Sequence, residues 1–164
     1  MSFPPDEIRT TVEKIASILN SRGQTLATSE SACGGLISSY LVSVAGASSY
    51  YVGGTMTYAL KSRLKLSGWS ADDIKSYTGP SEDVALRLAR NMKLELGSTY
   101  TLSETGWAGP TGDKVGTVYY GVAGPKQEIA VTQFINGKER SENMVEFACR
   151  ALEFLLEVLE ADGK

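Results

Sequence analysis

The chain has 164 residues, of which 42% are hydrophobic and 21% are charged, and its net charge is −3 at pH 7. This length is typical of one domain, and we expect residues 1–164 to form a single one. The scattered lysines and arginines argue against a nucleic-acid surface, and no apolar run approaches the roughly 20 residues that span a bilayer. The first residues lack a secretory signal pattern, which predicts a cytoplasmic protein.

The sequence contains no histidine. This removes the commonest general base and the commonest transition-metal ligand. The two cysteines, Cys33 and Cys149, are far apart and lack metal-site spacing, so we expect both to be reduced. We therefore expect no metal and no cofactor, and any catalytic base must be Lys, Tyr, Asp, Glu or a water that these residues hold.

The first part of the chain is predicted to alternate helices and strands. The pattern predicts a helix over 4–23, a strand over 24–30, a helix over 34–44 and a strand over 49–59. Gly23 and Gly46 are expected to end the two helices. Gly53 and Gly54 interrupt the second strand, which predicts a bulge or a close backbone approach.

The second part continues with helices over 60–68, 70–77 and 81–97, strands over 98–106, 115–124 and 128–135, and a helix over 138–163. Ser81 is placed to cap the third of these helices. The last two strands are separated by the short stretch "PKQ", which predicts an antiparallel hairpin. Together the elements predict an α/β fold, a three-layer α/β/α sandwich with a mixed β-sheet.

Three loops that follow predicted strands carry reactive side chains: "SESACGG", "GGTMTYALKSR" and "ETGWAGPTGDK". Because open α/β sheets bind ligands at strand ends, we expect the three loops to converge. In the first loop, Ser31 and Cys33 are candidate nucleophiles, and the free backbone amides near Gly34 and Gly35 could bind an oxyanion or a phosphate. The alternative is a capping Ser31 and a small buried Cys33.

The other two loops leave similar alternatives open. Trp107 could stack on a flat ring, or its loop could be a plain glycine-rich turn; it matches neither a P-loop nor a dinucleotide-binding pattern. Lys61 could act as a base if burial lowered its pKa, but a solvated helix face also explains it. Arg63 stays protonated, so it could bind phosphate or stabilise an oxyanion but not accept a proton.

Taken in order, "SESACGG", "GGTMTYALKSR", "TGWAGPTGD" and "KVGTV" resemble the motifs of the CinA C-terminal domain family. The family patterns are approximately A-E-S-C-T-G-G, R-G-F-x-x-Y-S-N-x-x-K, T-G-x-A-G-P-x-G-G and P-V-G-T-V, and the similarity runs from the first helix to the last. The family includes stand-alone nicotinamide mononucleotide deamidases. The resemblance implies an α/β/α domain that forms a homodimer and converts nicotinamide mononucleotide to nicotinate mononucleotide and ammonia.

The resemblance also implies roles for individual residues. The family's presumed nucleophile falls on Ser31. Tyr58 and Thr105 match two further positions of the motifs and are expected to be catalytic, with Tyr58 or Lys61 relaying the serine proton. The presumed base, a lysine, falls on Arg63, which cannot accept the serine proton. Lys61 is a poor substitute, because two residues correspond to about 200° around a helix.

The implied substrate-binding residues are Glu30, Cys33, Gly34, Gly35, Gly106, Gly109 and Arg140, the last of these for the substrate phosphate. The resemblance implies that the partner is a small-molecule nucleotide, and it leaves two functions open. The first is an amidohydrolase acting on the carboxamide of a pyridine nucleotide. The alternative is a catalytically altered homologue that binds the nucleotide without deamidating it. A third interpretation keeps an enzyme but makes Cys33 its nucleophile.

Overall fold

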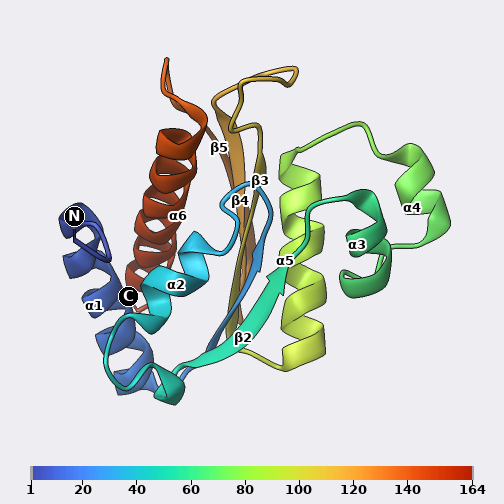
Figure 1. Cartoon of the computed structure of the whole chain (residues 1–164). Coiled ribbons are helices and arrows are strands. Elements are labelled where there is room, and N and C mark those ends of the chain that lie inside the picture. The colour runs from blue at the N-terminus through green and yellow to red at the C-terminus, as the bar shows by residue number, and fades with distance from the viewer. Residues whose placement is uncertain (1, 164) are drawn as a thin grey trace.

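The computed structural model describes residues 2–163, and its centre is a five-stranded mixed sheet (Figure 1). The strands are β1 (Leu26–Glu30), β2 (Tyr51–Met56), β3 (Tyr100–Gly106), β4 (Thr117–Ala123) and β5 (Glu128–Phe134). Their spatial order is β2-β1-β3-β4-β5. β1 pairs in parallel with β2 and β3, whereas β3 with β4 and β4 with β5 pair antiparallel. The predicted mixed sheet and its hairpin are confirmed; residues 1 and 164 lie outside the described range.

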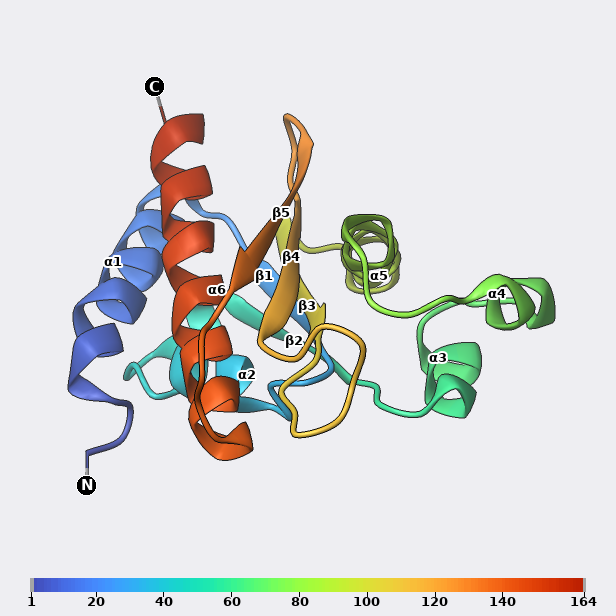
Figure 2. The same ribbon diagram turned by 90° about the horizontal axis from the view of Figure 1, so that it is seen from above.

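Helices cover both faces of the sheet, which gives the predicted three layers (Figure 2). One face carries α1 (Asp6–Arg22), α2 (Leu36–Val42) and α6 (Arg140–Asp162), and the other carries α5 (Glu82–Leu96). The short helices α3 (Leu60–Leu66) and α4 (Ala71–Ser76) lie farther from the sheet on the side of α5. None of the helices within residues 2–163 is long and apolar enough to cross a membrane.

The main apolar core lies between the sheet and α1, α2 and α6, where the repeating apolar face of α1 is buried. A much smaller cluster of Trp69, Val84 and Leu88 joins α5 to the segment that carries α3 and α4. Since burial of apolar surface supplies most of the stabilisation, this segment is held less strongly than the helices on the opposite face.

Two of the helix ends predicted from capping residues are present in the structure, and one is not. The Gly23 N–H donates to the carbonyls of Asn20 and Leu19 at the end of α1, and the Ser81 hydroxyl accepts from the Val84 N–H at the start of α5. The prediction that Gly46 ends α2 is wrong. The helix ends at Val42, where the Ser43 hydroxyl satisfies the Tyr40 carbonyl at 2.7 Å, and Gly46 instead precedes the short 3₁₀-helix η1 (Ala47–Ser49).

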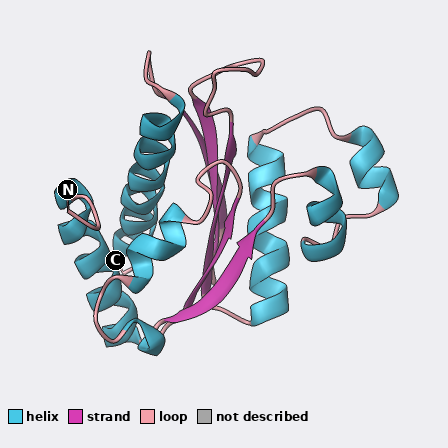
Figure 3. Cartoon of the chain, viewed as in Figure 1, coloured by secondary structure: helices cyan, strands magenta, loops and turns pink. Residues whose placement is uncertain are grey.

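After β1 and after β2, the chain leaves the sheet toward opposite faces. From β1 the chain passes through α2 on one face, and from β2 it passes through α3, α4 and α5 on the other (Figure 3). Open α/β sheets bind ligands in the crevice that such a divergence creates. The three predicted loops all leave the sheet at this end, because β1, β2 and β3 are parallel.

Gly54 lies where β2 approaches β1 most closely. A Cβ at this position would lie 2.2 Å from the backbone oxygen of Thr28 and 2.4 Å from its hydroxyl oxygen. The pairing of β1 with β2 also shifts register between Leu26 and Ala27. Both the close approach and the irregularity predicted from the double glycine are therefore present.

Replacing Gly54 with alanine should destabilise the domain by about 2 kcal/mol or more, because overpacking of this kind typically costs ~1–3 kcal/mol. The control is Gly137→Ala, where no atom lies within 4 Å and φ is 65°. It should lose about 1 kcal/mol, the cost of a left-handed alanine. Chemical denaturation measures both changes, and equal losses would show that the contact with Thr28 is relieved without strain.

Candidate functional site

The carboxyl ends of β1, β2 and β3 bring Ser31, Thr57 and Thr105 to one place. Ser31 follows β1, Thr57 follows β2, and Thr105 is the penultimate residue of β3. The Ser31 hydroxyl donates to the Thr57 carbonyl at 2.8 Å. The predicted convergence of the three loops is therefore present in the structure.

Arg63 on α3 connects these strand ends. Its Nη2 donates to the Ser31 hydroxyl oxygen at 2.8 Å and to the Thr105 hydroxyl oxygen at 3.3 Å. The position that corresponds to the family lysine thus contacts the serine. The hydroxyl of Ser31 is engaged on both sides, because its proton points to Thr57 and its oxygen accepts from a cation.

The surroundings of Arg63 are aromatic and closed. The residue is 3% exposed, and its guanidinium carbon lies 5.2 Å from the ring centre of Trp69 and 5.3 Å from that of Tyr77. Such rings attract a cation electrostatically. Within residues 2–163, Arg63 forms no ion pair with a carboxylate, and its Nε has no hydrogen-bond partner. The site therefore contains a buried positive charge without a contacting counter-ion.

Glu104 is a site residue that the sequence interpretation missed. One of its carboxyl oxygens accepts from the backbone N–H groups of Ser31, at 2.6 Å, and Cys33, at 2.8 Å. Complete burial raises the pKa of Glu104 to about 7, with Glu30 adding to the rise and the two amides opposing it. A carboxylate inside the otherwise buried run "YTLSETG" was the available signal, since acidic residues are rarely buried without partners.

Glu30 accounts for the start of α2 and corrects one expectation. Its carboxylate accepts from the N–H groups of Gly35, Ile37 and Ser38 and from the Ser38 hydroxyl. The Gly34 N–H donates to the Ser31 carbonyl. The amides of Gly34 and Gly35 are therefore occupied by the protein, and the prediction that they are free for an oxyanion is wrong.

Another backbone amide is closer to the serine. The N–H of Ala32 forms no hydrogen bond with any other residue in the described range. The amide that follows a nucleophilic residue is well placed to stabilise an oxyanion that forms on an attacked carbonyl. Capping does not explain Ser31, because the N-cap residue of α2 is Gly35.

Cys33 is fully buried beside the two acidic residues. Burial raises the pKa of its thiol well above the ordinary value, and the charges of Glu104 and Glu30 raise it further. The positive end of α2 does not offset this effect, because the Glu30 carboxylate already accepts from the N–H groups there. The thiol is therefore protonated and shielded from solvent, and these surroundings favour Ser31 over Cys33 as a nucleophile.

Tyr58 and Arg140 form a second group at the site rim. Arg140 donates through Nη2 to the Tyr58 hydroxyl at 2.8 Å and through Nη1 to the Gly109 carbonyl. Tyr58 is 63% exposed and forms no hydrogen bond with Ser31, so the structure does not place it as a proton relay. Lys61 is also exposed, as its helical position predicts.

A cavity of about 410 Å³ adjoins Arg140. Its other lining residues are Ala108, Gly109, Pro110, Val115, Gly137, Lys138 and Glu139.

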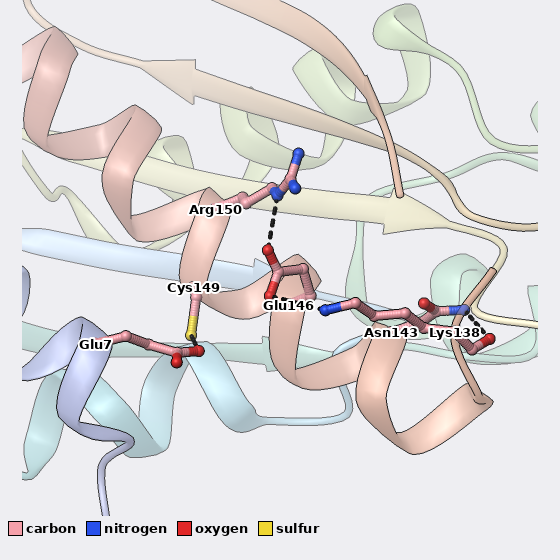
Figure 4. Close-up of polar contacts among 6 residues, drawn as sticks. All are labelled: Glu7, Lys138, Asn143, Glu146, Cys149 and Arg150. Carbon is pink, nitrogen blue, oxygen red and sulfur yellow. Dashed lines mark hydrogen bonds and ion pairs between the residues drawn. The ribbon is translucent and has the colours of Figure 1, made fainter. Parts of the chain in front are cut away.

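Asn143 anchors the beginning of α6, the helix whose first residue is Arg140 (Figure 4). The Asn143 amide donates to the Lys138 carbonyl at 3.1 Å and to the Ala108 carbonyl at 2.9 Å, which joins this helix start to the third loop. Farther along the same helix, Cys149 contacts Glu7 of α1 at 3.8 Å. Asn143 was not identified from sequence, because its partners are backbone groups far along the chain.

The third loop is shaped mostly by packing. A Cβ on Gly106 would lie 2.6 Å from the Thr117 carbonyl oxygen, so this glycine permits the pairing of β3 with β4. Trp107 packs edge-on against Tyr119, with ring centres 6.2 Å apart, and also lies against Gly112. The expectation that Trp107 stacks on a ligand ring gains no support from this arrangement.

Comparisons with known proteins agree with the fold and the motifs. The family model described as the CinA C-terminal domain matches residues 8–159. A CinA-like protein of Trichormus variabilis is 35% identical over 147 residues, which are 86% of this chain and 35% of the relative. A CinA-like protein of Salinibacter ruber is 39% identical over 85% of this chain and 34% of the relative. The chain thus spans about a third of the length of these curated relatives.

Solved structures give the same result. The crystal structure of the competence/damage inducible protein CihA from Agrobacterium tumefaciens superposes with a TM-score of 0.89 at 25% identity, over 98% of this chain and 99% of that one. A competence or damage-inducible protein from Enterobacter asburiae gives a TM-score of 0.86 at 22% identity, over 93% of this chain and 98% of that one. The α/β fold and the resemblance predicted from the four motifs are confirmed.

The buried carboxyl of Glu104 should make stability depend on pH. Its pKa rises from 4.5 to about 7 on folding, so between these values the folded protein holds a proton that the unfolded chain has lost. Stability should therefore fall as pH rises through this window. Because Glu104→Gln removes the titrating group, the variant should gain about 3 kcal/mol relative to the wild type between pH 5 and pH 8.

Urea denaturation at a series of pH values measures this difference. Glu142→Gln, which removes a carboxylate from the exposed surface of α6, is the matched control and should not reproduce the change. A constant difference in unfolding free energy between Glu104→Gln and wild type would show that Glu104 is ionised throughout.

Proposed function

Because the chain belongs to the CinA C-terminal domain family, we propose that it binds a pyridine mononucleotide at the strand-end site without hydrolysing its carboxamide. One observation carries this proposal: Arg63 donates to the Ser31 hydroxyl at 2.8 Å from the position where the family pattern has its lysine. The site thus keeps the serine and the surrounding loops, but has a permanent cation in place of the presumed base.

The chemistry of serine activation supports the lack of hydrolysis. A serine hydroxyl attacks an amide effectively when a nearby base accepts its proton. An arginine guanidinium stays protonated, and the Ser31 proton is directed to the Thr57 carbonyl, which is a very weak base. Within the described residues, the nearest carboxylate, Glu104, binds the backbone N–H of Ser31 rather than its hydroxyl.

The rim supports nucleotide binding. The exposed guanidinium of Arg140 and the amine of Lys138 border the cavity of about 410 Å³, a volume in the range of small-molecule sites. Arginine suits phosphate through paired, charge-assisted hydrogen bonds. In this arrangement the phosphate binds near Arg140, and the pyridine ring points toward Ser31 and Thr105.

The second candidate is an amidohydrolase that converts nicotinamide mononucleotide to nicotinate mononucleotide and ammonia. It is favoured by the unpartnered N–H of Ala32, which could hold the oxyanion after Ser31 attacks the carboxamide carbon. The nitrogen of the carboxamide would take up one proton and leave as ammonia. Water would then hydrolyse the ester between the ring carbonyl and Ser31, which releases nicotinate mononucleotide. This path needs a water molecule to accept the serine proton.

Three further expectations from the sequence analysis stay predictions. They are a homodimer, a cytoplasmic location and a single domain over residues 1–164. Sedimentation equilibrium of the purified chain tests the first of these directly.

We expect calorimetry to detect binding of nicotinamide or nicotinate mononucleotide, with no ammonia released from the amide. Arg140→Ala should weaken binding by about tenfold or more, because a charge-assisted contact to phosphate is lost. Lys61→Ala, which removes an exposed cation on α3, is the matched control and should bind normally.

The Arg63→Lys variant tests the loss of the base. Ammonia release from nicotinamide mononucleotide should appear in this variant and disappear again in the double variant that adds Ser31→Ala. Release by the wild type that Ser31→Ala abolishes would instead support the amidohydrolase. Failure of both nucleotides to bind would contradict both candidates.

A further inference from the structure

The guanidinium of Arg63 is a buried cation with unused hydrogen-bonding capacity. The residue is 3% exposed, its Nε has no partner within residues 2–163, and its described contacts are two neutral hydroxyls and two aromatic rings. A buried charge is costly unless an opposite charge accompanies it. Since no carboxylate within residues 2–163 forms an ion pair with Arg63, an anionic group of a ligand would complete the environment of this cation.

The nearby acidic residues do not supply this anion. Glu104 lies on the other side of Ser31 and accepts from the backbone amides of Ser31 and Cys33. Glu30 is bound by the first amides of α2. Burial raises the pKa of Glu104 to about 7, so this carboxyl is partly neutral at physiological pH. Neither carboxyl forms an ion pair with Arg63.

We propose that Arg63 makes the site selective for a pyridine nucleotide whose ring carries a carboxylate rather than a carboxamide. The inference rests on the proposed function for the location of the nucleotide. A planar guanidinium can bind both oxygens of a carboxylate through parallel N–H donors, whereas a carboxamide presents one oxygen and a competing N–H₂ donor. The same substitution that removes the base therefore changes the preferred ligand.

The hydroxyl groups beside Arg63 fit this ligand. Thr105 accepts from Nη2 at 3.3 Å, so its own proton is available to a ligand oxygen, and Ser31 lies 2.8 Å from the same nitrogen. The Ser31 proton is donated to the Thr57 carbonyl, so the free donors at this point are the Thr105 hydroxyl and the guanidinium, which together favour an anion over a neutral amide. Because Arg63, Ser31 and Thr105 are all buried, we infer that α3 moves aside when the ligand enters. Among the buried apolar clusters of residues 2–163, only the small one of Trp69, Val84 and Leu88 packs against this helix, through Leu60.

The experiment compares nicotinate and nicotinamide mononucleotide by calorimetry with the wild type and with Arg63→Met. The acid should bind about tenfold more tightly or better to the wild type, and Arg63→Met should lose this preference. Methionine preserves an unbranched apolar stem beside Trp69 and Tyr77, and circular dichroism verifies folding. Lys61→Met removes an exposed cation from the same helix and should retain the preference.

A second measurement separates this inference from the proposed function. Thermal unfolding is followed with the free ring acids and amides, pyridine-3-carboxylate and pyridine-3-carboxamide. Stabilisation by the carboxylate alone, lost in Arg63→Met, supports the role of Arg63 even if neither nucleotide binds. Two results would overturn the inferred selectivity for a ring carboxylate. One is equal affinity of the wild type for both nucleotides. The other is no stabilisation by the ring carboxylate together with no preference for the acid nucleotide.

Discussion

The hydrogen bond from Arg63 to Ser31 is the interaction on which the proposed chemistry of this site depends. It joins α3 to the end of β1, and the same nitrogen reaches Thr105 at the end of β3. The hydrogen bond orients the Ser31 hydroxyl. Because the guanidinium is permanently charged, Arg63 cannot act as the base that accepts the serine proton. In the proposed function, the identity of this one side chain makes the site a binding site and not a hydrolytic one.

Two buried carboxyl groups hold the serine in position from the opposite side. Glu30 fixes the start of α2, and Glu104 fixes the backbone between β1 and that helix. Buried acids of this kind are tolerated because several backbone amides donate to them. Burial, together with the charges of these two acids, raises the pKa of the Cys33 thiol and keeps it protonated, which leaves the hydroxyl of Ser31 as the candidate nucleophile of this corner.

The sequence was sufficient to predict the fold and the meeting of the loops, because both follow from local signals. Apolar periodicity and glycine positions marked the elements, and parallel strands bring their carboxyl ends together. The role of Glu104 could not be predicted in this way, since its partners lie 73 and 71 residues away. The use of the amides at Gly34 and Gly35 was mispredicted for a different reason: their acceptors, the Ser31 carbonyl and the Glu30 carboxylate, are close in sequence, but the chain has to fold back before they meet these amides. The contact of Tyr58 with Arg140 joins two loops whose approach is set by the packing of α6.

The reactivity of Ser31 toward a fluorophosphonate, followed by intact-protein mass spectrometry, tests the central claim most directly. Such probes phosphonylate a serine oxygen, with loss of fluoride, when a neighbouring group can accept the serine proton. We predict no adduct on the wild type and an adduct on Arg63→Lys that disappears when Ser31 is also replaced by alanine. A rapid adduct at Ser31 of the wild type would show that the serine is activated despite Arg63, and would contradict the account.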